Sequence, residues 1–131
     1  MTDFPDSEKR QFVRIPVNVD IECRFICQDD GTPVSDQTFS GHTGNIGAGG
    51  LLLVGPVPAP DLISDLLMRR VVVAITVLLP DHQPIQALAR VAWLEAVDQA
   101  HQTCSMGLTF KEITLAAQDE LFRFIINAVS G

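Results

Sequence analysis

The chain has 131 residues, which is the size of one domain with a hydrophobic core of its own. With 47% hydrophobic and 19% charged residues it is globular rather than disordered, and its net charge of −7 argues against general binding to nucleic acid. A specific anionic ligand is still compatible with this charge, because a few clustered arginines outweigh the mean charge locally.

Signals for export and for membrane insertion are missing from the sequence. Residues 1–8 carry three acidic side chains where a secretory signal needs positive charge and an apolar run. The longest strongly apolar stretch, residues 71–79, is about half of the roughly 20 residues that a membrane helix requires. We therefore expect a cytoplasmic protein that does not insert into membranes.

Two arginines, Arg10 and Arg14, precede the first expected strand in a segment with little apolar content, which we expect to be a loop. Four residues of extended chain span on the order of 13 Å, so the two guanidinium groups can reach either side of a dinucleotide-sized ligand. Each group can grip a phosphate or the O6 and N7 edge of guanine. Spacing alone favours a simpler explanation, in which the two arginines keep an acidic protein soluble or pair with Asp6 and Glu8.

Residues 17–25 alternate strictly between apolar and polar side chains, which predicts a half-buried strand. Turn-forming residues at 28–35 lead to a second expected strand at 38–43. The glycine-rich segment 44–50 is expected to turn and to let a ligand approach the backbone, where the amide of Asn45 offers a donor and an acceptor. A hairpin turn explains this segment as well. Its glycines fit neither a dinucleotide fingerprint nor a P-loop.

The remaining pattern predicts strands at 51–54, 70–79, 85–97 and 104–111, with a brief helix at 61–68. Five or six antiparallel strands with short connections imply a barrel or a sandwich. The chain then changes to a helical period, with Thr114 as the expected N-cap, and this helix should pack on or beside the strands. Its apolar face is formed by Leu121, Phe124, Ile125 and Ala128 and is widened by Phe122, Ile126 and Val129.

Trp93 is the only tryptophan and the sole large aromatic side chain in its strand. It can stack on a guanine at the barrel surface, although such a residue more often lies in the core. The alternation around it does not settle which face it occupies.

Neither a catalytic centre nor a metal site is indicated by the cysteines and histidines. Cys23 and Cys27 are too far apart in an extended strand to form a disulfide, so reduced thiols are expected. Cys104 and His101 are the nearest nucleophile and base, but three residues apart they should face different sides. The cysteines form no zinc-binding pattern with His42, His82 and His101. A thiol enzyme that uses Cys104 is the least favoured function.

Taken together, the motifs resemble the PilZ domain family. The sequence K-R-Q-F-V-R at residues 9–14 resembles the R-x-x-x-R motif of that family, and N-I-G-A-G-G at residues 45–50 resembles its D/N-x-S-x-x-G motif. R-V-A-W at 90–93, M-G-L-T-F at 106–110 and the terminal helix resemble further family features. The likeness covers nearly the whole chain.

This resemblance implies an all-β dominated fold, a six-stranded antiparallel barrel with a C-terminal α-helix over residues 17–131. A flexible ligand-binding segment, residues 1–16, would precede it. The implied function is a non-enzymatic receptor for cyclic di-GMP, a bacterial second messenger. On binding it would change its surface and regulate an unidentified effector protein in motility, pilus, biofilm or virulence output.

Carried over residue by residue, the resemblance makes Arg10 and Arg14 contacts to phosphate and guanine, Asn45 a contact to a guanine edge, and Gly50 the tight turn. Trp93 is an additional candidate for stacking. Gly47 stands where the motif has serine, and the missing hydroxyl is worth about 0.5–1.5 kcal/mol, so ligand binding should be weakened rather than abolished. The alternative is a protein-interaction adaptor that binds cyclic di-GMP weakly or not at all.

Overall fold

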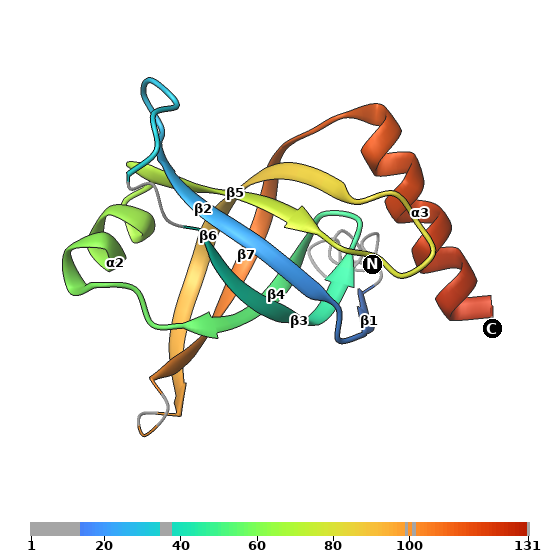
Figure 1. The fold of residues 1–131 in the computed structure, drawn as a ribbon, viewed down its shortest axis with the longest axis horizontal. Coiled ribbons are helices and arrows are strands. Elements are labelled where there is room, and N and C mark those ends of the chain that lie inside the picture. Colours follow the sequence, from blue (N-terminus) through green and yellow to red (C-terminus); the bar gives the residue numbers. More distant parts are fainter. Residues whose placement is uncertain (1–13, 35–37, 99, 101, 131) are drawn as a thin grey trace, which may run out of the picture.

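The computed structural model describes residues 14–34, 38–98, 100 and 102–130. Figure 1 shows a β-barrel with one helix, α2, near one end and a longer helix, α3, at the other. Within the described residues the sheet has seven antiparallel strands in the order β1-β3-β2-β5-β6-β7-β4, and pairing between β3 and β4 closes it. Six strands form the closed barrel, as expected, and β1 pairs with the end of β3, along the same edge of β3 that β2 pairs with.

The strands are β1 (Arg14–Pro16), β2 (Asp20–Cys27), β3 (Phe39–Gly47), β4 (Gly50–Pro56), β5 (Val71–Val77), β6 (Ile85–Asp98) and β7 (Thr103–Ile113). The helices are α2 (Pro60–Leu67) and α3 (Leu115–Ser130). No helix in the described part of the chain is long and apolar enough to cross a bilayer.

Alternation of side chains places the core inside the barrel. In β2, Ile21 and Cys23 are buried whereas Glu22 and Arg24 are exposed, which confirms the predicted period of two. The same alternation brings one row of buried side chains together across four neighbouring strands, because the register aligns them as Ile46, Leu51, Leu108 and Val91. The outward-facing residues beside this row form the barrel surface considered below.

Two predictions about the segments around Asn45 are wrong. The expected loop at Arg14 is in part a strand, since β1 pairs with β3. The turn expected at 44–50 is limited to Ala48 and Gly49, because β3 continues to Gly47 and pairs at Asn45 and Ile46 with both β1 and β4. Asn45 therefore lies in a strand, held between two others.

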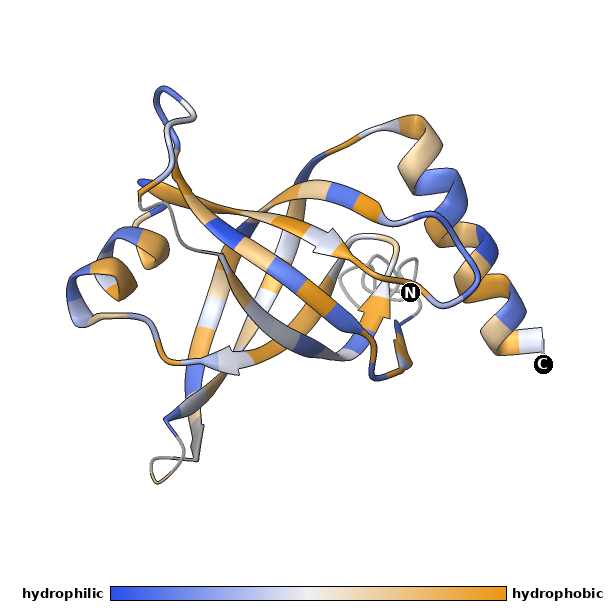
Figure 2. Cartoon of the chain, viewed as in Figure 1, coloured by the Kyte–Doolittle hydropathy of each residue, from blue (hydrophilic) through white to orange (hydrophobic). Residues whose placement is uncertain are grey.

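Helix α3 begins as predicted, because the backbone N–H of Ala117 donates to Oγ1 of Thr114 at 3.1 Å. Leu121 and Ile125 are the buried residues of this helix and belong to the barrel core cluster. Figure 2 shows hydrophobic and hydrophilic bands alternating along α3. The helix thus packs on the barrel with one face and leaves the rest of its surface free of the barrel.

Candidate functional site

The candidate site rests on a hydroxyl group beneath β1. Thr43 is the buried polar residue of β3, 1% exposed. Its Oγ1 accepts a hydrogen bond from the N–H of Val19 at 3.0 Å and donates one to the carbonyl oxygen of Val17 at 2.6 Å. Both partners lie in the short connection between β1 and β2, so Thr43 fixes where β1 lies along β3.

The pairing of β1 with β3 brings Arg14 to Asn45. Arg14 lies opposite Gly47 and Pro16 lies opposite Asn45, so the arginine and the asparagine are diagonal neighbours. Nη1 of Arg14 donates to Oδ1 of Asn45 at 3.2 Å. Arg14 is exposed and Asn45 is half-buried, which leaves the guanidinium and the amide accessible to a ligand. Two of the predicted ligand groups therefore lie in contact.

Trp93 lies on the same outer face of the barrel. The strand registers align Asn45 with Leu52, Leu52 with Gly107 and Gly107 with Trp93, in one row across β3, β4, β7 and β6. This row is adjacent to the buried row of the core and therefore points outward. Three strand spacings give the row a length of about 14 Å, enough for a dinucleotide-sized ligand.

Two glycines let apolar side chains lie flat on this face. A Cβ at Gly107 would come within 2.2 Å of Nε1 of Trp93, so the indole covers the glycine backbone. A Cβ at Gly44 would come within 2.7 Å of Cδ2 of Leu52, which covers that backbone in the same way. Trp93 is 45% exposed. It is therefore a surface residue and not a core residue, as stacking on a ligand requires.

Gly50 has a structural role in the closure of the barrel. A Cβ at this position would lie 2.0 Å from the carbonyl oxygen of Leu108 on β7. No side chain fits there without opening the pairing of β4 with β7. Gly50, expected to form the tight turn, instead begins β4 directly after the turn, at a close backbone approach.

The structure brings Arg14, Asn45 and Gly47 together and sets Trp93 at the far end of the same row. Arg10 lies outside the described residues, so its part in the site stays a prediction. Sequence reasoning missed Leu52 and Gly107, because a leucine and a glycine inside strands carry no chemical signal of their own.

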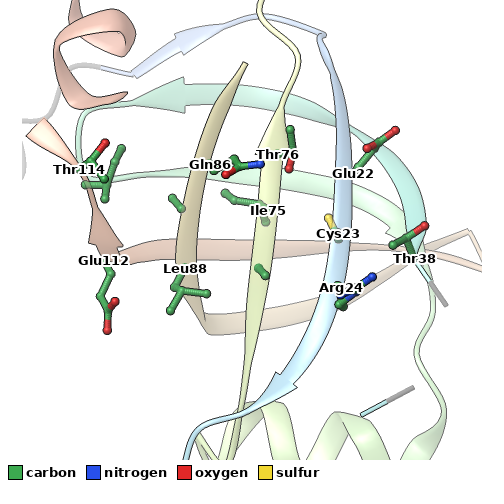
Figure 3. Close-up of a pocket in the computed structure, with 13 residues that line it drawn as sticks. Glu22, Cys23, Arg24, Thr38, Ile75, Thr76, Gln86, Leu88, Glu112 and Thr114 are labelled. Atoms are coloured by element: carbon green, nitrogen blue, oxygen red, sulfur yellow. The ribbon is translucent and has the colours of Figure 1, made fainter. Parts of the chain in front are cut away.

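A cavity of about 690 Å³ lies elsewhere, over β2, β5, β6 and the end of β7 (Figure 3). Among the described residues, its charged lining consists of Glu22, Arg24 and Glu112, and it includes none of Arg14, Asn45, Gly47, Gly50 and Trp93. Two carboxylates against one guanidinium give it no net attraction for an anionic ligand.

The chemistry of the thiols does not suit a nucleophile. Cys104 is fully buried, its Sγ lies 3.7 Å from the carbonyl oxygen of Pro56, and burial raises the pKa of its thiol. His101, its expected base, lies outside the described residues. Burial, with a smaller contribution from Glu22, raises the pKa of the Cys23 thiol to about 12. Within the part of the chain that the structure describes, no group of three histidine, cysteine or acidic residues could hold a metal ion.

Comparison with known proteins places the chain in a family. The family model described as PilZ domain matches residues 8–127. No curated protein sequence matches the chain significantly.

Three solved structures share the fold at low sequence identity. The Bacillus subtilis inhibitor of motility MotI/DgrA has a TM-score of 0.63 at 19% identity, over 92% of this chain and 52% of its own. The K. pneumonia MrkH–c-di-GMP complex has a TM-score of 0.62 at 15% identity, over 92% and 52%. The PilZ domain of YcgR from Escherichia coli with c-di-GMP has a TM-score of 0.56 at 14% identity, over 91% and 90%. The chain spans about half the length of the first two proteins.

Proposed function

The chain belongs to the PilZ domain family, and on that premise we propose that it is a receptor for cyclic di-GMP that regulates a partner protein. The observation that carries the proposal is the contact of Arg14 with Asn45 at one end of the outward row that ends at Trp93. The proposed ligand lies along this row and displaces no core residue.

The chemistry of the row matches the parts of cyclic di-GMP. The exposed guanidinium of Arg14 suits a phosphate or the O6 and N7 edge of guanine, and the amide of Asn45 suits a base edge. The indole of Trp93 offers a π-face for a purine, and such stacking is worth about 1–3 kcal/mol per base. Two of the related structures are described as complexes with c-di-GMP, which supports the same ligand for this fold.

We assign no catalytic step to the protein. Ligand binding is proposed to change the surface around β1, and an unidentified effector protein is proposed to bind the changed surface. The free cysteines Cys23, Cys27 and Cys104 suit the reducing cytoplasm in which such a receptor would act.

Isothermal titration with cyclic di-GMP tests the proposal. Wild-type protein should bind, and Arg14→Ala should lower the affinity about 10- to 150-fold, because a charged hydrogen bond contributes about 1.5–3 kcal/mol. Arg10→Ala is expected to act in the same direction. Arg24→Ala is the matched control, since it removes the same charge from an exposed site on β2 and should leave affinity unchanged. If wild-type protein gives no heat of binding at high micromolar concentrations of cyclic di-GMP, the proposal is wrong.

Gly47 favours a second candidate, an adaptor that binds a partner without cyclic di-GMP. Gly47 lies opposite Arg14 in the pairing of β1 with β3. The hydroxyl group that a serine would provide is therefore absent beside the guanidinium of Arg14. For an adaptor of this kind, the amide NMR spectrum should not change when cyclic di-GMP is added. A partner protein should be recovered by pull-down without the nucleotide. A partner captured only with nucleotide would argue against the adaptor.

A further inference from the structure

Helix α3 carries more apolar surface than the barrel covers. Leu121 and Ile125, 1% and 9% exposed, form its buried face. Four other large apolar side chains are exposed to solvent, and we call them the outer stripe: Leu115 at 83%, Phe122 at 39%, Ile126 at 60% and Val129 at 63%. Single exposed apolar residues are ordinary, but four of them along one helix form a patch of the kind that marks an interaction surface.

The outer stripe is a single line along the helix. Successive helical residues are rotated by about 100°, which puts Val129, Phe122, Leu115 and Ile126 at about 80°, 100°, 120° and 140° from Leu121. The buried face lies at about 0–40° on the same scale, so the stripe continues it to one side. A helix that only covers a barrel end has no need of this second apolar line.

The stripe is symmetric about Phe122. Leu115 lies seven residues before Phe122 and Val129 lies seven residues after it, and Phe122 is close to the middle of the helix, which spans Leu115–Ser130. If two copies of α3 packed antiparallel with a two-fold axis near Phe122, Leu115 of each would meet Val129 of the other. The two Phe122 rings would meet at the axis.

The charges beside the stripe are nearly symmetric about the same axis, because Asp119 and Arg123 are centred on Leu121, one residue from Phe122. Asp119 and Arg123 are exposed and form an ion pair within the helix, with Oδ2 and Nη2 3.0 Å apart. In an antiparallel pair the order of these residues is reversed between the two helices, so Asp119 of one copy faces Arg123 of the other. Opposite charges would therefore meet across the axis on both sides, whereas a parallel pair would place like charges side by side.

We propose that the outer stripe is a self-association surface that joins two copies of this chain through an antiparallel α3 pair. Its four side chains offer far less area than the roughly 800 Å² per partner of a standard stable interface. The dimer is therefore weak and depends on concentration. This surface is separate from the ligand row and needs no nucleotide.

Sedimentation equilibrium of the full chain with a reducing agent, from 10 μM to 1 mM and without nucleotide, tests the proposal. Wild-type protein should shift from monomer to dimer over this range. Ile126→Glu should raise the dissociation constant at least tenfold, because the two-fold axis introduces the charge twice. Asn127→Glu places the same charge on an exposed residue of the opposite face and should change it less than twofold. Unchanged thermal midpoints would show that both variants are folded.

A charge exchange tests the antiparallel arrangement. Asp119→Arg alone should weaken the dimer several-fold, because it sets arginines against each other, and adding Arg123→Asp should restore wild-type association. A double variant that fails to recover would overturn the antiparallel pair. Wild-type protein that stays monomeric at 1 mM, or equal effects of Ile126→Glu and Asn127→Glu, would overturn the self-association surface itself.

Discussion

Replacing Thr43 with valine should show how strongly one hydroxyl holds β1 in position. Valine has nearly the same shape, so the core packing is kept while both hydrogen bonds of Oγ1 are removed. The N–H of Val19 then loses its acceptor, which lies at 3.0 Å in the wild-type protein. The carbonyl oxygen of Val17 loses its donor, which lies at 2.6 Å. A buried backbone group without a partner costs about 1–3 kcal/mol, and Val17 is only half-buried, so water can satisfy its carbonyl in part.

We therefore expect Thr43→Val to lower the free energy of unfolding by about 2–4 kcal/mol. Thr43→Ser is the control, because it keeps both hydrogen bonds and loses one methyl group, worth about 0.8 kcal/mol. Urea unfolding of the three proteins, followed by far-ultraviolet circular dichroism, measures the difference.

Hydrogen exchange locates the damage. In Thr43→Val the amides of β1 and its partner residues on β3 should exchange faster, while those of β5 keep their protection relative to global unfolding. The reasoning is refuted if Thr43→Val is no more destabilising than Thr43→Ser, or if exchange rises equally in all strands.

The other predictions use glycine contacts and a buried thiol. Gly50→Ala should destabilise the protein by about 1–3 kcal/mol, because its Cβ would lie 2.0 Å from a backbone oxygen, whereas Gly55→Ala meets nothing closer than 3.9 Å and should be near neutral by urea unfolding. Equal effects would contradict this. Gly107→Ala should displace the indole of Trp93, seen as a shifted fluorescence emission, and should weaken nucleotide binding; an unchanged emission spectrum would argue against the stacked geometry. The pKa of the Cys23 thiol is raised from 9.0 to about 12 in the folded protein, so the unfolded chain loses this proton first as the pH rises. The free energy of unfolding should therefore fall between those two pH values by up to about 1.4 kcal/mol per pH unit. Cys23→Ala should reduce that slope, and an identical slope in both proteins would count against the buried neutral thiol.

Features set by local patterns could be predicted from the sequence. The strand around Ile21 and Cys23 follows from a period of two, and the start of α3 follows from the capping hydroxyl of Thr114. Both depend on residues within a few positions of each other. Strand β1 could not be predicted in this way, because it has three residues and its partner Asn45 is about thirty positions away in the sequence.

The side of the barrel wall that Trp93 occupies could not be predicted from the sequence. The register of β6 against β7 shifts between Val91 and Trp93, so one extra residue interrupts the alternation. Val91 points inward and Trp93 points outward although they are two apart, which no strict period allows. Gly107 matters only because that indole lies over it from the next strand. The motif resemblance singled out Arg14 and Asn45, which the structure brings into contact, and the ligand roles of both and of Arg10 stay predictions.

A fluorescence titration with cyclic di-GMP shows whether the ligand lies along the outward row from Asn45 to Trp93. Trp93 is the only tryptophan, and the chain has no tyrosine, so the fluorescence signal comes from the Trp93 end of the row alone. If the ligand lies along the row from Asn45 to Trp93, the emission should change to saturation, and Arg14→Ala should shift the midpoint to higher concentration. Heat of binding with unchanged Trp93 emission would contradict the proposed row, and the absence of both signals would contradict the receptor.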